Sequence, residues 1–281
     1  MVNAKMNDNY IIAIPSYKRY EMILNKRNAL DYFDDELLKK TKLAIRIIES
    51  EEYLPVFNKY KGLGTYFLNN TTSGIVETRN NILKHSMLAY TKLIMIDDDT
   101  AFAFRPNLNG NMYTNQSKKM FREMIKELLY YCGCNYPIVG ITARQFSNTK
   151  TNIKDENTRI AQVYCLHLPT LKKENIQFGE GSLTCMEDYY LIIKMLKLGY
   201  KNLCLNQYTR DDTKTQRPGG CAETRTAKSH SNSARRLCKM FPDIVVPYIK
   251  NNGTWKEKRI NVRVKWKKAF NKKLYEERSK E

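Results

Sequence analysis

Short apolar runs alternate with amphipathic segments along most of this 281-residue chain, and this alternation constrains the fold more than any other feature. The clearest run, "KLIMIDDD" (residues 92–99), predicts a buried strand. Residues 118–131 carry apolar side chains on one helical face, and "EDYYLIIKMLKLGY" (residues 187–200) predicts a helix that Gly199 stops. Strands that alternate with helices imply a mostly parallel sheet with helices on both faces. We therefore expect an α/β fold.

Two of the predicted strands end in polar residues. The strand predicted in "IIAIPSY" (residues 11–17) ends at Pro15 and is followed by Ser16 and Tyr17. The stretch "KLIMIDDD" ends in three consecutive aspartates. In open α/β sheets, ligands bind outside the carboxyl ends of the strands. We therefore expect both segments to border the ligand site.

Asp97 and Asp99 form a D-x-D pattern. Two carboxylates that point toward one site repel each other unless a cation lies between them. Oxygen ligands favour Mg²⁺ or Mn²⁺ over zinc, and a cation held by one or two carboxylates keeps open positions for phosphate oxygens. We predict such a cation site, with Asp98 as a backbone- or sugar-contacting neighbour. The alternative is an acidic turn in which Asp99 or Thr100 caps a following helix.

A second acidic pair, Glu187–Asp188, opens the helix predicted at residues 187–200. The preceding "FGEGSLTCM" contains two glycines, which suits a loop over a pocket. A carboxylate at the mouth of that pocket can take the proton of an attacking hydroxyl, and of the two we choose Asp188 as this base. The alternative is that both acids only stabilise the N-terminus of the helix.

Two further side chains are candidates for the site. Arg79 suits bidentate pairing with a diphosphate, although a surface arginine is the simpler interpretation. His230 is a candidate third metal ligand, although most single histidines have no such role.

The formal net charge of +19 indicates which kinds of partner the protein can bind, but it says nothing about the fold. Nucleic acid, an anionic membrane surface or a phosphorylated ligand suits it, and so does a lysine-rich surface encoded by an AT-rich genome. No run is long enough to span a bilayer, and the first residues lack a signal-peptide pattern. The seven cysteines are scattered and odd in number, which favours reduced thiols. We therefore expect a cytoplasmic protein.

Two basic segments are candidates for binding a polyanion. Residues 213–236 are polar and predict a mobile loop over an anionic substrate, or else a disordered surface loop. "KRINVRVKWKK" (residues 258–268) predicts a half-buried strand within a basic extension (residues 251–281) that follows a catalytic domain (residues 1–250). Its inward residues are Ile260, Val262, Val264 and Trp266, and its outer row consists of Asn261, Arg263, Lys265 and Lys267. The alternative is an edge strand guarded by lysines. The side chains predicted to contact nucleic acid are Arg144, Arg217, Arg225, Lys228, Arg263 and Lys265.

The order of these motifs resembles the GT-A glycosyltransferase arrangement over residues 10–235. Within that fold the chain is most similar to the phage DNA-modifying, TET-associated glycosyltransferases. The motifs that carry the resemblance are "IPSYKR", "TRNNIL", "LIMIDDD", "MEDYYLIIKMLKLGY" and "VRVKW". The resemblance implies transfer of a sugar from a nucleotide sugar, expected to be a UDP-sugar, to a hydroxymethylated pyrimidine in phage DNA, with Mn²⁺ or Mg²⁺.

The resemblance also implies a role for each matching position. Asp97 and Asp99 would bind the cation, and Asp188 would be the base if the reaction inverts the sugar. The residues expected to bind the nucleotide sugar are Pro15, Ser16, Tyr17, Arg19, Arg79, Asp97 and Asp98. Three alternatives remain open: a protein, lipid or polysaccharide acceptor; a nucleotidyltransferase; and a non-catalytic nucleic-acid-binding protein.

Overall fold

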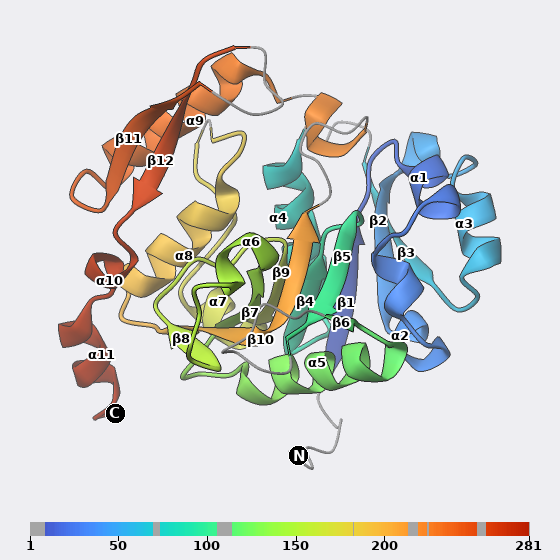
Figure 1. The fold of residues 1–281 in the computed structure, drawn as a ribbon, viewed down its shortest axis with the longest axis horizontal. Coiled ribbons are helices and arrows are strands. Elements are labelled where there is room, and N and C mark those ends of the chain that lie inside the picture. Colours follow the sequence, from blue (N-terminus) through green and yellow to red (C-terminus); the bar gives the residue numbers. More distant parts are fainter. Residues whose placement is uncertain are drawn as a thin grey trace.

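A computed structural model describes residues 9–69, 74–105, 114–181, 183–212, 219–223, 225–251 and 257–280. Its centre is one twisted sheet with the strand order β3-β2-β1-β4-β9-β7-β10-β5-β6, and β8 pairs with β10 (Figure 1). The strands of this sheet are β1 (Tyr10–Pro15), β2 (Thr41–Arg46), β3 (Gly64–Leu68), β4 (Lys92–Ile96), β5 (Thr100–Phe104), β6 (Thr114–Asn115), β7 (Ile138–Ala143), β8 (Lys154–Glu156), β9 (Val163–His167) and β10 (Asn202–Asp212).

Most strands of the sheet run in one direction. Strands β1 to β4 are mutually parallel, and β7 and β10 share their direction. Strand β9 lies antiparallel between β4 and β7, and β5 lies antiparallel to β10. The predicted α/β fold with a mostly parallel sheet is therefore confirmed. The apolar run "AQVYCLHL" (residues 161–168), which contains β9, indicates a buried strand, but it does not encode the direction of that strand.

Side chains alternate between two cores, one on each face of the sheet. Along β4, Leu93 and Met95 pack into the core that α4 (Ile75–Ser86), α8 (Glu187–Lys197) and α9 (Ala227–Met240) cover. Ile94 and Ile96 pack into the core under α5 (Lys118–Tyr131). The helices, including the 3₁₀ turns η1 to η3, are α1 (Tyr20–Asn25), η1 (Ala29–Tyr32), α2 (Asp35–Lys39), η2 (Ile47–Glu49), α3 (Leu54–Lys59), α4 (Ile75–Ser86), α5 (Lys118–Tyr131), α6 (Arg144–Ser147), α7 (Leu168–Lys173), α8 (Glu187–Lys197), η3 (Gly220–Glu223), α9 (Ala227–Met240), α10 (Trp266–Ala269) and α11 (Lys272–Arg278). Within the described ranges, no helix combines the length and apolar character needed to cross a membrane.

The prediction of a loop throughout residues 213–236 is wrong for its second half. Residues 213–218 and 224 lie outside the described residues, but α9 begins at Ala227. Thr226 caps this helix by accepting a hydrogen bond from the Ser229 amide at 3.0 Å. The buried face consists mainly of small side chains, among them Ser231 and Ala234, so it lacks the large apolar residues that usually indicate a helix.

A two-stranded hairpin lies outside the main sheet. It consists of β11 (Val245–Lys250) and β12 (Arg259–Val264), and it packs against α9 (Figure 1). The strand predicted in residues 258–268 ends at Val264 and does not reach Trp266. Trp266 instead begins α10 and stacks on Tyr189 of α8, with ring centroids 5.7 Å apart. Strand β11 ends at Lys250, the last residue of the predicted catalytic domain, and it pairs with β12 in the predicted extension. The division into two domains stays a prediction.

Candidate active site

The candidate site lies at the carboxyl ends of β1 and β4. Both strands run in the same direction, so the turn after Pro15 and the aspartates after Ile96 meet at one edge of the sheet. A cavity of about 530 Å³ opens beside Asp97. The charged side chains and the histidine that line it are Arg79, Asp97, Arg159, Glu187, Asp188, Arg210, Arg225, His230 and Lys250.

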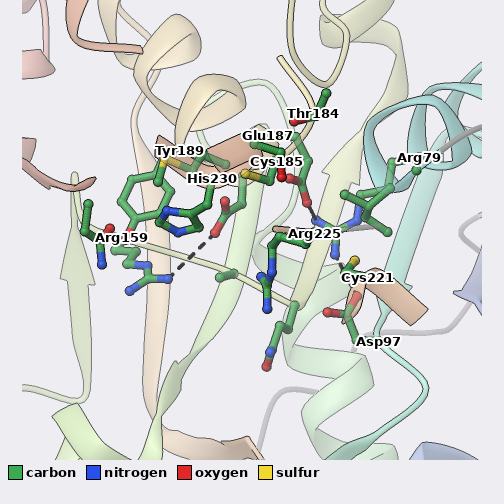
Figure 2. Close-up of a pocket in the computed structure, with 18 of the residues that line it drawn as sticks. Arg79, Asp97, Arg159, Thr184, Cys185, Glu187, Tyr189, Cys221, Arg225 and His230 are labelled. Atoms are coloured by element: carbon green, nitrogen blue, oxygen red, sulfur yellow. Dashed lines mark hydrogen bonds and ion pairs between the residues drawn. The ribbon is translucent and has the colours of Figure 1, made fainter. Parts of the chain in front are cut away.

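Arg79 joins the two acidic motifs (Figure 2). One terminal nitrogen of its buried guanidinium donates to Asp97 Oδ1 at 2.7 Å, and the other donates to Glu187 Oε1 at 2.7 Å. Burial raises the pKa of Glu187 above its usual range, and the Arg79 guanidinium opposes that shift. Arg79 is therefore not a surface arginine. It fixes two carboxylates on one wall of the cavity.

A second arginine holds the other two aspartates. Arg19 donates to Asp98 Oδ1 at 2.6 Å and contacts Asp99 Oδ2 at 2.9 Å. Ser16 donates to Asp98 Oδ2 at 2.8 Å, and its hydroxyl also bonds to the Tyr53 hydroxyl at 2.7 Å. Asp98 is buried, which raises its pKa, while Arg19 opposes the rise. Asp98 thus ties the β1 loop to the β4 turn, a structural role that the sequence did not indicate.

Asp188 lies in the first turn of α8, and its side chain lines the cavity. The residue before this helix, Met186 at its N-cap position, has a left-handed backbone with φ of 66° and provides no side-chain cap. The Asp188 carboxylate approaches the Arg159 guanidinium at 3.9 Å, whereas the Glu187 carboxylate is bound at 2.7 Å by Arg79. Of the two predicted bases, Asp188 is therefore the one less tightly held by a cation.

The cation site at Asp97 and Asp99 stays a prediction. Across the described ranges, no group of three or more His, Cys, Asp or Glu side chains is arranged to hold a metal ion. Asp97 and Asp99 bind different arginines, yet their side chains remain 22% and 20% exposed. Carboxylate oxygens suit Mg²⁺ or Mn²⁺, which one or two protein carboxylates hold when phosphate oxygens complete the shell. The donor chemistry fits a cation that arrives together with a diphosphate.

His230 lies on another part of the cavity wall. In Figure 2 it is beside Tyr189, whereas Asp97 lies near Cys221 and below Arg79. The Nδ1 atom of His230 bonds to the Ile260 carbonyl oxygen at 3.0 Å, so this nitrogen carries the proton. Burial lowers the pKa of the imidazole to about 4; the bond to Ile260 opposes the shift, and the charges of Arg225, Arg259 and Lys250 reinforce it. Its role as a metal ligand stays a prediction.

The segment that leads into α9 closes over the β1 loop. The Gly220 amide donates to the Tyr17 carbonyl oxygen at 2.7 Å. Gly219 and Gly220 have φ values of 82° and 61°. A Cβ atom on Gly219 would lie 2.5 Å from the Lys18 carbonyl oxygen, and one on Gly220 would lie 2.7 Å from the Arg19 guanidinium carbon. Only glycine permits this close approach, which holds Cys221 on the cavity wall.

The other predicted residues within the described ranges do not line the cavity. Tyr17 stacks under the Arg46 guanidinium at 4.1 Å, and Arg144 is exposed and paired with Asp211 at 2.9 Å. Pro15 is buried as the last residue of β1. The exposed side chains among the predicted nucleic-acid contacts include Lys228 on α9, Arg263 on β12 and Lys265 after it, while Arg217 lies outside the described residues.

Sequence reasoning missed several residues of the cavity wall. Arg159, Gln162 and Arg210 come from β9 and β10 and their flanking loops, and Lys250 and Asn261 come from the hairpin. Apart from Asn261, which the alternation in residues 258–268 places on the outer row, no local pattern marks these positions. They reach the cavity only because β9 and β10 lie beside β4 and β7, and because the hairpin folds back over α9.

The fold is that of the GT-A class. Solved structures support this fold at low sequence identity: TarS of S. aureus with UDP-GlcNAc has a TM-score of 0.52 and 12% identity, over 82% of this chain and 66% of that chain. Glucosyl-3-phosphoglycerate synthase of Mycobacterium tuberculosis, in complex with Mn²⁺, UDP-glucose and phosphoglyceric acid, has a TM-score of 0.52 and 11% identity, over 90% and 89%.

The family follows from the sequence comparisons. The model of the TET-associated glycosyltransferases matches residues 10–220, and the chain belongs to this family. Two curated relatives are each named "Beta-glucosyl-HMC-alpha-glucosyl-transferase", one from Enterobacteria phage T2 and one from Enterobacteria phage T6. Each is 24% identical over 238 residues, which cover 82% of this chain and 80% of the relative.

Proposed function

We propose that this enzyme transfers a sugar from a nucleotide sugar, expected to be a UDP-sugar, to the hydroxyl of a 5-hydroxymethylpyrimidine in phage DNA. The observation that carries the proposal is the make-up of the cavity. Three carboxylates and five guanidinium or ammonium groups line it, so the cations are in excess beside a candidate base. Both substrates, a sugar diphosphate and a DNA strand, are anionic. Such an enzyme would act in the cytoplasm of the host cell.

The donor side of this proposal is the edge formed by the β1 loop and the β4 turn. We assign residues Pro15 to Tyr17 to the nucleoside, with Arg19 and Asp98 holding the shape of that loop. Asp97 and Asp99 would hold Mg²⁺ or Mn²⁺, which neutralises the charge that develops on the leaving diphosphate. Both terminal nitrogens of Arg79 bind carboxylates, so its direct contact with the diphosphate stays a prediction.

For a reaction that inverts the sugar, the acceptor side of the proposal gives Asp188 the role of general base. The acceptor hydroxyl loses its proton to this carboxylate while its oxygen bonds to the anomeric carbon of the sugar. The bond from that carbon to the diphosphate breaks, and the nucleoside diphosphate leaves with the electron pair. Glu187 supports the site indirectly because its carboxylate is fixed by Arg79.

The phage relatives suggest a second acceptor. Their name includes a β-glucosyl-HMC group, so the acceptor hydroxyl of this enzyme is alternatively that of a sugar already attached to a hydroxymethylated pyrimidine. The same cavity and the same base would serve either acceptor, because both present a hydroxyl next to an anionic DNA strand.

Nucleoside mass spectrometry tests the proposal. The protein is incubated with Mn²⁺, a panel of UDP-sugars, and one of three duplexes: unmodified, 5-hydroxymethylated, or hydroxymethylated and β-glucosylated. We expect a sugar increment on one of the two modified duplexes and none on the unmodified one. A nucleotide increment would indicate a nucleotidyltransferase. Sugar transfer to a protein or polysaccharide acceptor, with none to any duplex, would show that the acceptor assignment is wrong.

A further inference from the structure

The hairpin β11–β12 has two faces with different roles. In the strand register, Val245 lies opposite Val264 and Pro247 lies opposite Val262, and the valines of this face are buried in the core against α9. The alternate positions point the other way. On this second face the opposed pairs are Val246 with Arg263, Tyr248 with Asn261, and Lys250 with Arg259. We call these six side chains the open face of the hairpin. Val246, Tyr248 and Arg263 are exposed, whereas Arg259 is buried within this face.

The open face continues the wall of the catalytic cavity. Lys250 and Asn261 line the cavity itself, and they occupy neighbouring positions of the open face. Arg225, which precedes α9, lies at the inner end of this surface and also lines the cavity. A strand that lies along the hairpin can therefore deliver one of its units into the cavity.

The open face is positively charged and carries an aromatic ring. Three of its six side chains are cationic, namely Lys250, Arg259 and Arg263, and Arg263 lies 5.9 Å from the centre of the Tyr248 ring. Burial lowers the pKa of Arg259, and the nearby charge of Arg225 lowers it further. Like charges gathered in this way repel one another, and an anion bound across them would relieve that repulsion.

The donor diphosphate does not account for this surface. The proposed donor side lies at the ends of β1 and β4, whereas the hairpin lies outside the main sheet, against α9 (Figure 1). Cations spaced along a strand beside an aromatic ring match a chain that alternates phosphates with bases. Phosphate contacts position such a chain, and aromatic rings stack on its bases.

We propose that the open face of the hairpin, with Arg225 at its inner end, binds the phosphodiester backbone of the acceptor DNA strand and stacks a base on Tyr248. This rests on the proposed function for the identity of the strand. The surface adds Lys250, Arg259 and Tyr248 to Asn261 and Arg263, which the sequence had placed on the outer row of this strand.

The test measures the affinity of the full-length protein for a fluorescein-labelled 5-hydroxymethylcytosine duplex by anisotropy, at several salt concentrations. The double variant Lys250→Gln/Arg263→Gln should lose about one unit of salt slope for each lost phosphate contact. The variant Tyr248→Ala should bind about tenfold more weakly at every salt concentration. The matched control is Lys272→Gln/Lys273→Gln on α11, which removes the same charge from exposed positions away from the cavity and should bind as the wild type does. Thermal unfolding confirms that each variant is folded.

The outcomes separate the two proposals. If the hairpin variants bind DNA as the control does while the wild type glycosylates DNA, the inference about the hairpin is wrong and the proposed function stands. If DNA binding depends on the hairpin but no sugar reaches any duplex, the inference holds and the proposed acceptor is wrong. If the wild type does not bind DNA at low salt, the hairpin does not bind the acceptor strand.

Discussion

The two ends of the candidate cavity differ in how their charged side chains are arranged. At the β1 and β4 end, which we call the matched end, two guanidinium groups each hold two carboxylates at 2.6 to 2.9 Å. At the hairpin end, the charges that act on His230 are those of Arg225, Arg259 and Lys250, all of them positive. This difference supports the proposals that the matched end holds the reacting groups in a fixed geometry and that the hairpin end, which we call the positive end, receives an anion.

The largest effect is expected at Arg79, which holds the matched end together. Arg79→Met leaves the Glu187 and Asp97 carboxylates without their shared counter-charge in a buried place. We expect a loss of about 3–5 kcal/mol in the free energy of unfolding, measured by urea denaturation. Arg79→Lys is the matched control. It keeps the charge but not the two terminal nitrogens that bind separate carboxylates, and it should lose less stability than Arg79→Met. Wild-type stability in Arg79→Met would show that the pairing is not structural.

The next effect concerns Asp188. Asp188→Asn keeps the size of the side chain and removes the base, so the rate of sugar transfer should fall by about 10²–10⁴. The affinity for DNA should stay within about twofold, because this carboxylate lies in the cavity and not on the open face of the hairpin. Quenched-flow transfer assays and anisotropy measure the two quantities. Undiminished transfer would remove Asp188 from the mechanism and leave Glu187 or another group as the base.

A smaller effect is expected where the segment before α9 docks on the β1 loop. Gly219→Ala places a Cβ atom 2.5 Å from the Lys18 carbonyl oxygen on a backbone with a φ of 82°. We expect destabilisation of about 1–3 kcal/mol and a higher KM for the nucleotide sugar, since both elements border the donor side. Gly133→Ala is the control, because a Cβ atom there would have open space. Equal stability of the two variants would contradict the docking.

The smallest effect concerns the pKa of His230, which responds to the positive charges at the hairpin end of the cavity. The unfolded chain protonates His230 near pH 6.5, whereas the folded chain does so near pH 4. Protons therefore bind preferentially to the unfolded chain between these values, and the contribution of His230 to stability is full above pH 6.5 and lost as the pH falls to 4.

Arg225→Gln tests this titration. Removing the positive charge should raise the pKa of His230 toward its ordinary value, measured by NMR titration of the imidazole signals. Arg235→Gln, an exposed position on α9, is the control and should leave it unchanged. A His230 pKa that does not respond to Arg225→Gln would mean that burial alone sets its value.

The sequence predicts the matched end of the cavity better than the positive end. "KLIMIDDD" and "IIAIPSY" are local patterns, and parallel strands bring their ends together by the general rules of α/β sheets. The bridge from Arg79 to Glu187 spans 108 positions of the chain, so the individual motifs could be predicted but their contact could not. The small buried residues of α9 hid that helix, and without it the return of the hairpin to the cavity was not predictable either.

The most direct test of this division measures the rate of sugar transfer as a function of DNA concentration for two variants. Asp188→Asn should lower kcat and leave the KM for DNA nearly unchanged. Lys250→Gln/Arg263→Gln should raise that KM about tenfold, as expected for lost phosphate contacts, with kcat nearly unchanged. If the hairpin variant instead lowers kcat at an unchanged KM, or if both variants change the same parameter, the two ends of the cavity do not have the separate roles assigned to them.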